Sequence, residues 1–214
     1  ITLIDKLMDI SFCDKKCSNI NDNETKGQIS IDGQVNFQRM SDVGGMTGFG
    51  LRGEYAQSEK IGIRVGFDYF FGNSTDYEAS AYSNGSGPSI GVKYTESYSI
   101  INITAGGKYY FVGDYEEDFG IYGLLDVGLM LAPVKYEYGS YDQTMYSLYE
   151  NENTMLFNFS IGGGIGAEYK VGPGSVFSNL YLSLPANNVN GVVVEVSIPP
   201  AIGLSLGYRY MFDI

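Results

Sequence analysis

The chain has 214 residues with 29 Gly, 19 Tyr and no His or Trp, and its formal net charge is −12. This length fits one domain with a short appendage, and the acidity disfavours nucleic acids and anionic lipid surfaces as partners. The absence of His excludes catalysis in which a His activates Ser or Asp.

Residues 1–27 stand apart from the rest of the chain. The apolar spacing in residues 1–12 is closer to helical than to alternating, and residues 18–26 are mostly polar. We expect a short N-terminal periplasmic segment that docks or links, with a loosely ordered tail as the alternative. Cys13 and Cys17 favour a small disulfide loop over free thiols, and a zinc site would need further ligands.

From Gln28 to the end, the chain predicts a single domain of eight β-strands. Large apolar residues alternate there with small or polar ones, as side chains alternate across a strand. In the last strand the even positions from Ile202 to Phe212 are all large and apolar, while the odd positions are Gly, Ser, Arg and Met. The eight segments are 28–38, 47–57, 61–71, 101–111, 119–131, 157–169, 176–184 and 201–212.

No stretch qualifies as a transmembrane helix, because the most apolar segment, 121–134, is too short and contains Asp126. The connections between the predicted strands instead differ in length. Those after the second, fourth and sixth strands are short, whereas 72–96 and 133–153 are long and are expected to be loops. An even strand count with short turns on one side and long loops on the other is typical of outer-membrane barrels, whose termini are periplasmic.

The polar face of these strands decides between a membrane barrel and a soluble lipocalin-like barrel, which would hide its apolar face inside. That face carries charges of both signs among many Gly residues, which suits a narrow interior filled by ion pairs better than a water-exposed surface. The predicted polar network of the lumen consists of Arg52, Glu54, Arg64, Asp68, Lys108, Asp126, Glu168 and Arg209.

Two further motifs have plain structural interpretations. The run Gly162–Gly166 lacks the following helix and the Lys-Ser/Thr pair of a phosphate loop, so we expect small residues that let a strand or a lumen side chain approach. The acidic residues 116–118 indicate a solvated turn, with a calcium site as the weaker alternative.

The second long connection is rich in Tyr and acidic residues, and its aromatic residues are Tyr136, Tyr138, Tyr141, Tyr146 and Tyr149. Tyr offers rigid contact area at little entropic cost, so these residues suit recognition by an exposed loop. The alternative is an interfacial girdle with a protruding hairpin stem. Residues 192–198 alternate as well and suggest a projecting sheet with a free edge.

Residues 28–212 resemble the small eight-stranded outer-membrane barrels of the OmpA/OmpX kind. The final strand resembles the C-terminal assembly signal of such proteins, which here comprises Ser205, Gly207, Tyr210 and Phe212. The chain departs from the pattern by continuing to Ile214, whereas many members end on the aromatic residue. The tyrosine-rich acidic loops and the N-terminal leader also resemble those of Bacteroidetes-type barrels.

The resemblance implies an all-β, eight-stranded, antiparallel up-and-down transmembrane β-barrel in the bacterial outer membrane. Outer-membrane lipid would surround it, both termini would be periplasmic, and the barrel-assembly machinery would be its partner during biogenesis. We expect a non-enzymatic protein without cofactor or metal, which serves as a structural or interaction component or a small subunit of an outer-membrane complex. The alternatives are a surface adhesin or defence barrel that acts through its loops, and a narrow channel or ligand-binding barrel.

Overall fold

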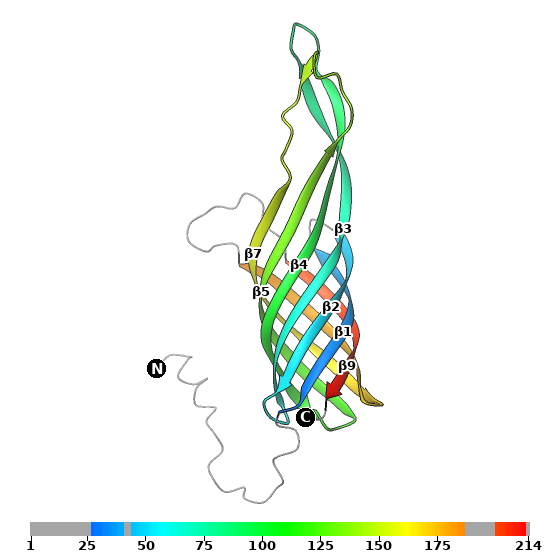
Figure 1. Cartoon of the computed structure of the whole chain (residues 1–214), viewed down its shortest axis with the longest axis vertical. Coiled ribbons are helices and arrows are strands. Elements are labelled where there is room, and N and C mark those ends of the chain that lie inside the picture. Colours follow the sequence, from blue (N-terminus) through cyan, green and yellow to red (C-terminus); the bar gives the residue numbers. More distant parts are fainter. Residues whose placement is uncertain (1–26, 41–43, 187–199, 213–214) are drawn as a thin grey trace, which may run out of the picture.

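The computed structural model describes residues 27–40, 44–186 and 200–212, and these form one antiparallel sheet that closes on itself (Figure 1). Its strands are β1 (Ile29–Met40), β2 (Gly44–Ala56), β3 (Ile61–Ser83), β4 (Ile90–Val112), β5 (Phe119–Tyr138), β6 (Tyr146–Ser147), β7 (Thr154–Val171), β8 (Gly174–Ala186) and β9 (Ala201–Phe212). Since β1 pairs with β9 and β2 pairs with β3, all strands except β6 form a closed barrel of eight. The predicted fold class is confirmed.

The connections separate the two ends of the barrel. At one end, here called the short-turn end, the strands are joined by residues 57–60, 113–118 and 172–173. Gly113 and Gly172 have φ values of +69° and +63°, a left-handed backbone that favours glycine in these turns. Ile29 pairs with Phe212 at the same end, so the described chain starts and finishes there. The other end is called the long-loop end. None of the described residues forms a helix long and apolar enough to cross a membrane.

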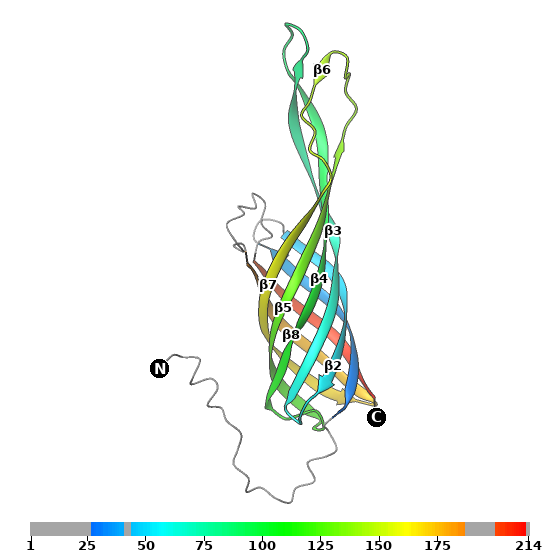
Figure 2. The same cartoon turned by 60° about the vertical axis from the view of Figure 1, so that its left-hand side comes forward.

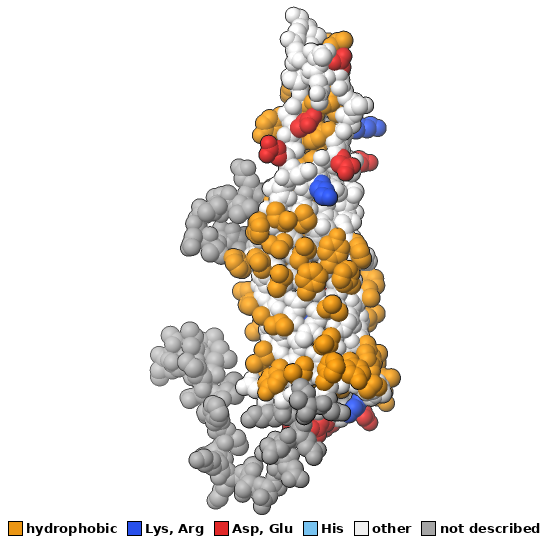
Figure 3. Space-filling view, in the orientation of Figure 1, with side chains coloured by type: hydrophobic (Ala, Val, Ile, Leu, Met, Phe, Trp, Pro, Cys, Tyr) orange, Lys and Arg blue, Asp and Glu red, His pale blue; other side chains and the backbone are white. Residues whose placement is uncertain are grey.

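The apolar face of every barrel strand points outward. In β9, Leu204, Leu206 and Tyr210 are 42–48% exposed, whereas Ser205 and Arg209 between them are buried. The outward side chains form the belt visible in Figure 3. Aromatic residues are concentrated toward its margins. Those near the short-turn end are Tyr55, Tyr109, Phe111, Phe119, Tyr169, Tyr208, Tyr210 and Phe212. Such a surface is stable in hydrocarbon and costly in water, which confirms the predicted facing of the strands.

The prediction that 72–96 and 133–153 are loops is wrong for much of their length. Strands β3, β4 and β5 continue beyond the belt as a three-stranded sheet, here called the blade, which comprises residues 71–83, 90–98 and 132–138 (Figures 1 and 2). Ser, Thr and Tyr are frequent in this sheet, and cross-strand Tyr pairs stabilise it together with a few buried apolar residues such as Ala81 and Val92. Near its tip β6 pairs with β3 through Tyr82 and Ser147.

A β-bulge marks the place where the blade leaves the belt. The register of β3 against β4 shifts by one residue between Phe70 and Asn73. On the barrel side of the bulge the outward residues of β3 are apolar and include Phe67 and Phe71; beyond it they are polar and include Asp76. The extra residue therefore changes which alternate residues of β3 point outward, and it does so at the edge of the apolar belt. As a result, the inner face of the blade continues the inner face of the barrel.

Three expectations lie outside the described residues. They are the N-terminal segment, the Cys13–Cys17 disulfide and the projecting strand at residues 192–198.

Candidate functional site

The eight residues predicted to form a polar network all point into the barrel, and none is more than 9% exposed. Strands β2, β3, β4, β5, β7 and β9 supply them, so the closure of the sheet brings together charges from distant parts of the sequence. The structure divides them into two groups, and it adds Asp32 of β1 to the first.

The first group is centred on Arg209. Its guanidinium lies 3.0 Å from Asp32 Oδ1, 2.7 Å from Glu168 Oε2 and 3.6 Å from Glu54 Oε2. Lys108 Nζ approaches the same Glu168 oxygen at 2.9 Å and Glu54 Oε1 at 3.6 Å. Two cations thus face three carboxylates, and all five side chains are buried. Each carboxylate is paired with Arg209, which makes that residue the common partner of the group.

Buried tyrosines complete the first group. The Tyr110 hydroxyl donates to Glu168, and the Tyr115 hydroxyl donates to Glu54 at 2.6 Å. Lys108 Nζ also lies 3.9 Å from the centroid of the Tyr122 ring, within the range of a cation–π contact. These hydroxyls and rings add partners to the charged atoms of the group, although Glu54 Oε2 accepts no hydrogen bond from the described residues.

The second group consists of two side-on Arg–Asp pairs. Arg52 binds both oxygens of Asp68 at 2.9 and 3.0 Å, and Arg64 binds both oxygens of Asp126 at 2.9 and 2.5 Å. Asn36 donates a further hydrogen bond of 2.8 Å to Asp68. Such bidentate pairs have a fixed geometry, so they tie β2 to β3 and β3 to β5 on one side of the barrel.

Apolar side chains close the lumen toward the long-loop end. The buried cluster there comprises Met40, Met46, Phe70, Ile100, Met130, Ala132 and Ala201. Beneath it lies a cavity of about 40 Å³, lined in part by Asn36, Arg64 and Asn179. This volume accommodates about three water molecules. The lumen is therefore packed with side chains rather than open along its length.

The glycine run of β7 makes room for two inward aromatic rings. A Cβ placed on Gly162 would lie 1.7 Å from the Tyr181 hydroxyl oxygen, and one on Gly166 would lie 2.3 Å from the Tyr122 ring. The run therefore lets bulky lumen side chains approach the wall.

We expect Gly166→Val to destabilise the barrel by about 1–3 kcal/mol, because the added methyls would displace Tyr122 from the lumen. Gly33→Val is the control, since a Cβ placed on Gly33 meets no atom within 4 Å. Urea titration of the two variants, followed by heat-modifiable gel mobility in lipid vesicles, measures the difference. Equal loss of stability in both variants would contradict this account.

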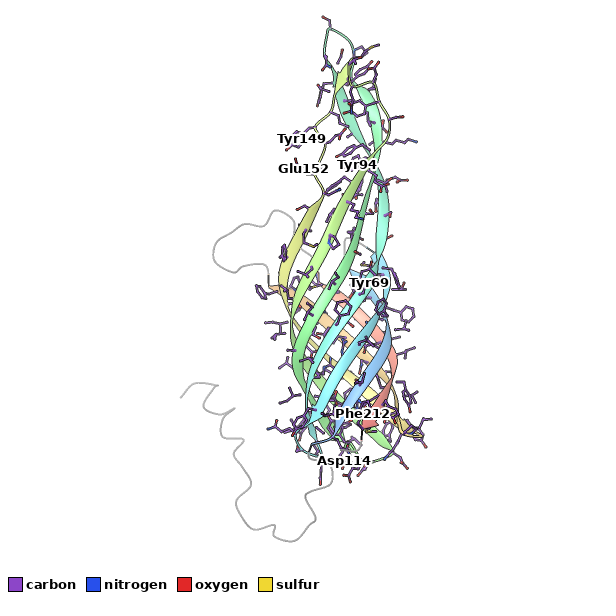
Figure 4. The ribbon with its side chains drawn as sticks, viewed as in Figure 1. Tyr69, Tyr94, Asp114, Tyr149, Glu152 and Phe212 are labelled. Atoms are coloured by element: carbon purple, nitrogen blue, oxygen red, sulfur yellow. The ribbon has the colours of Figure 1, made fainter. Side chains whose placement is uncertain are left out.

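The proposed assembly signal lies on both faces of β9. Ser205 and Gly207 point into the barrel, and Gly207 passes close to the backbone of Gly33. Tyr210 and Phe212 point outward at the short-turn end, with ring centroids 4.9 Å apart. Figure 4 shows Phe212 at this end of the barrel. The two aromatic rings are therefore accessible from the surroundings of the barrel.

The inner face of the blade carries a grid of side chains in three rows. The registers align Tyr77, Tyr94 and Tyr138 in one row and Thr75, Glu96 and Tyr136 in the next. The third row is Asn73, Tyr98 and Val134. The Tyr94 ring stacks between its row neighbours, with centroid distances of 5.4 Å to Tyr77 and 5.1 Å to Tyr138. Glu96 is thus the central residue of the grid.

The Glu96 carboxylate influences the tyrosines around it. Partial burial is the main cause that raises the pKa of Tyr136, and Glu96 raises it further. The same carboxylate contributes to the raised pKa of Tyr98 and of Tyr94, for which burial is again the first cause. These hydroxyls therefore remain protonated at neutral pH and surround a single negative charge.

The five tyrosines predicted for recognition occupy different places. Tyr136 and Tyr138 belong to β5 and to the grid, so their assignment to a loop is wrong. Tyr146 lies in β6, and Tyr141 and Tyr149 lie in the connection between β5 and β7. Tyr149 is 90% exposed and lies on the segment that returns from the blade tip toward β7 (Figure 4).

Comparisons with known proteins found relatives in structure but not in sequence. No family model and no curated protein matches the sequence. A major outer membrane protein from Thermus thermophilus is 14% identical, with a TM-score of 0.58 over 87% of this chain and 99% of that one. Neisserial surface protein A is 17% identical, with a TM-score of 0.51 over 86% of this chain and 96% of that one. Ail of Yersinia pestis is 16% identical, with a TM-score of 0.49 over 87% and 99% of the two chains.

The chain has the fold of the small eight-stranded outer-membrane β-barrels. The predicted resemblance to barrels of the OmpA/OmpX kind is thereby confirmed at the level of architecture. Because these identities are low, the likeness concerns the fold, and the role of this outer-membrane barrel has to be argued from its own residues.

Sequence reasoning missed Asp32 in the polar network of the lumen and Glu96 in the grid of the blade. Asp32 lies on the polar face of its strand together with Gln34 and Asn36. The alternation of residues along the strand was therefore enough to place it in the lumen. Glu96 was missed because its segment was interpreted as a loop. The alternation of Tyr94, Glu96 and Tyr98 could have indicated a strand. Only the pairing with the neighbouring strands shows that Glu96 lies among tyrosines.

Proposed function

We propose that the protein is a non-enzymatic interaction component of the bacterial outer membrane, which uses its barrel as an anchor and its blade as the recognition element. Both termini would be periplasmic, the blade would extend outside the cell, and the barrel-assembly machinery would insert the chain through the signal in β9. The continuation of β3, β4 and β5 beyond the apolar belt is the single observation that carries this proposal.

The packing of the lumen supports recognition over transport. Ion pairs fill one part of the barrel and apolar side chains close the next, with a cavity of only about 40 Å³ between them. A narrow channel would need a continuous path through these side chains. We therefore expect single-channel recordings of the reconstituted protein to show no conductance, and steady conductance would favour the channel.

Photocrosslinking in intact cells tests the recognition role. A photoreactive residue replaces Tyr149, which is 90% exposed near the blade, or Phe111, which is 60% exposed at the short-turn end. We expect a discrete macromolecular adduct from position 149 and none of the same mass from position 111. In a second variant, an Asn-Gly turn replaces residues 73–98 and so removes the blade parts of β3 and β4. We expect the adduct from position 149 to disappear in this variant. Heat-modifiable gel mobility verifies that its barrel is folded. Retention of the adduct without the blade would overturn the proposal.

A further inference from the structure

The charge at the centre of the blade grid has no balancing cation in the described part of the chain. Glu96 is half-buried, between Thr75 and Tyr136 across the sheet and between Tyr94 and Tyr98 along its own strand. No salt bridge involves it among the described residues, in contrast to all nine charged residues of the lumen. A partly desolvated carboxylate is stabilised when a cation approaches it.

The basic residues of the blade lie on its other face. Lys93 and Lys135 are exposed and point outward, since they pair with Glu78 and Ser97 on the polar side of the sheet. Residues 139–153, which connect β5 to β7, contain no Lys or Arg, and neither do residues 187–199. The connection between β5 and β7 therefore supplies acids and tyrosines but no cation.

The tyrosines around Glu96 suit an organic cation. The face of an aromatic ring attracts ammonium and guanidinium groups, and a neighbouring carboxylate adds a direct ion pair. Tyr136 lies beside Glu96 in the same row and is tilted rather than stacked against Tyr94, with a centroid distance of 6.4 Å. Tyr77 and Tyr138 cover the two faces of Tyr94 in the next row, so a cation reaches the ring of Tyr136 rather than that of Tyr94. The Tyr136 hydroxyl also offers an acceptor to the N–H groups of such a ligand, whereas the Tyr138 hydroxyl already accepts from the backbone N–H of Asn151.

We propose that the inner face of the blade binds a Lys or Arg side chain of an extended partner peptide, with Glu96 as the pairing carboxylate and the surrounding tyrosine rings as the cage. This inference rests on the proposed function, since it specifies the chemistry of what the blade recognises. Tyr136 flanks the carboxylate across the sheet and contacts the cation, and Thr75 completes the row.

An extended peptide fits this face better than a free amine because a strand edge lies beside the grid. Between Thr75 and Ser80 the outer edge of β3 has no partner strand among the described residues, because β2 pairs with β3 only as far as Phe70 and β6 only from Tyr82. A peptide added at this edge directs every second side chain toward the inner face. Alternating basic residues would then reach the row of Glu96.

The purified full chain in detergent micelles provides the test. The probe is a fluorescent eight-residue peptide of alternating Thr and Lys, with a Thr-Gln peptide as the neutral control, and anisotropy measures its binding. We expect Glu96→Gln to weaken binding of the Thr-Lys peptide by about tenfold and the Thr-Gln peptide to bind neither protein. Glu137→Gln is the matched control, because it removes the same charge from the outer face one residue from Tyr136, and it should change affinity less than twofold.

A pair of tyrosine variants tests whether an aromatic ring contributes to binding in addition to the charge of Glu96. Tyr136→Phe keeps the ring and should bind nearly as well as the original protein, whereas Tyr136→Leu should bind several-fold more weakly. Heat-modifiable mobility verifies that each variant is folded. Equal weakening by Glu96→Gln and Glu137→Gln, or equal binding of the Phe and Leu variants, would overturn the proposal.

Spermidine serves as a competitor that distinguishes peptide from free polyamine. We expect it to displace the peptide only at a large excess, and displacement at equal concentration would overturn the assignment to a peptide. If Glu96→Gln has no effect on peptide binding while the blade deletion still abolishes crosslinking in cells, the cation site fails and the recognition role stands. Loss of neither signal would reject both.

Discussion

Arg209→Met is expected to destabilise the barrel by about 3–5 kcal/mol, because it removes one partner of a buried ion-pair group. Arg209 is the common partner of Asp32, Glu54 and Glu168, and it is 2% exposed. Without it, Lys108 alone faces three carboxylates, and two negative charges remain unpaired inside the barrel. The free energy of unfolding, obtained from urea titration of the protein folded into lipid vesicles, measures this loss.

A double variant gives the control for this prediction. Adding Asp32→Asn to Arg209→Met removes one of the stranded charges and should restore part of the lost stability, since the effects of residues in one network are not additive. Arg209→Lys keeps the charge but not the branched donor geometry and should fall between the original protein and Arg209→Met. If Arg209→Met were as stable as the original protein, this would show that hydration, rather than pairing with Arg209, stabilises these carboxylates.

Leu206→Arg is expected to cost about 2–4 kcal/mol of folding free energy in a bilayer, because it places a charge on the lipid-facing side of the barrel near its middle. Leu206 is 48% exposed, in the belt between Leu204 and Tyr208. Its neighbours across the sheet are Val35 and Ser178. Folding yield and stability in vesicles measure the cost, which should fall in short-chain detergent because water reaches the charge there.

The adjacent residue provides the matched control. Ser205 is 9% exposed and points into the lumen, so Ser205→Arg should disturb packing by about 1–3 kcal/mol without opposing insertion. Its cost should be similar in vesicles and in detergent. If both variants respond to the lipid alike, the assignment of the two faces of β9 is wrong.

Much of the barrel was predictable because each strand carries its own signal. Alternation in β9 places Leu206 and Ser205 on opposite faces in any environment, since consecutive side chains point in opposite directions. The balanced charges on the polar face indicated which side is enclosed. Closure of the sheet followed from the even number of strands and from the asymmetry of the connections, two properties that are readable along the chain.

The blade and the pairing of charges were not predictable in the same way. A polar segment such as 72–96 reads as a loop, because only the neighbouring strand shows that Tyr77, Tyr94 and Tyr138 form one row. Likewise, parity places Arg209 in the lumen, but the register of several strands decides that it meets Asp32, Glu54 and Glu168.

The sequence by itself determined the architecture, the two faces of each barrel strand and the residues that line the lumen, because these depend on a local period of two. Only the tertiary structure decided how far β3, β4 and β5 extend, where the bulge turns β3 over, and that Glu96 sits among tyrosines without a cation in the described part of the chain. These features depend on cross-strand register, which joins residues far apart in the chain and has no signature within any single strand.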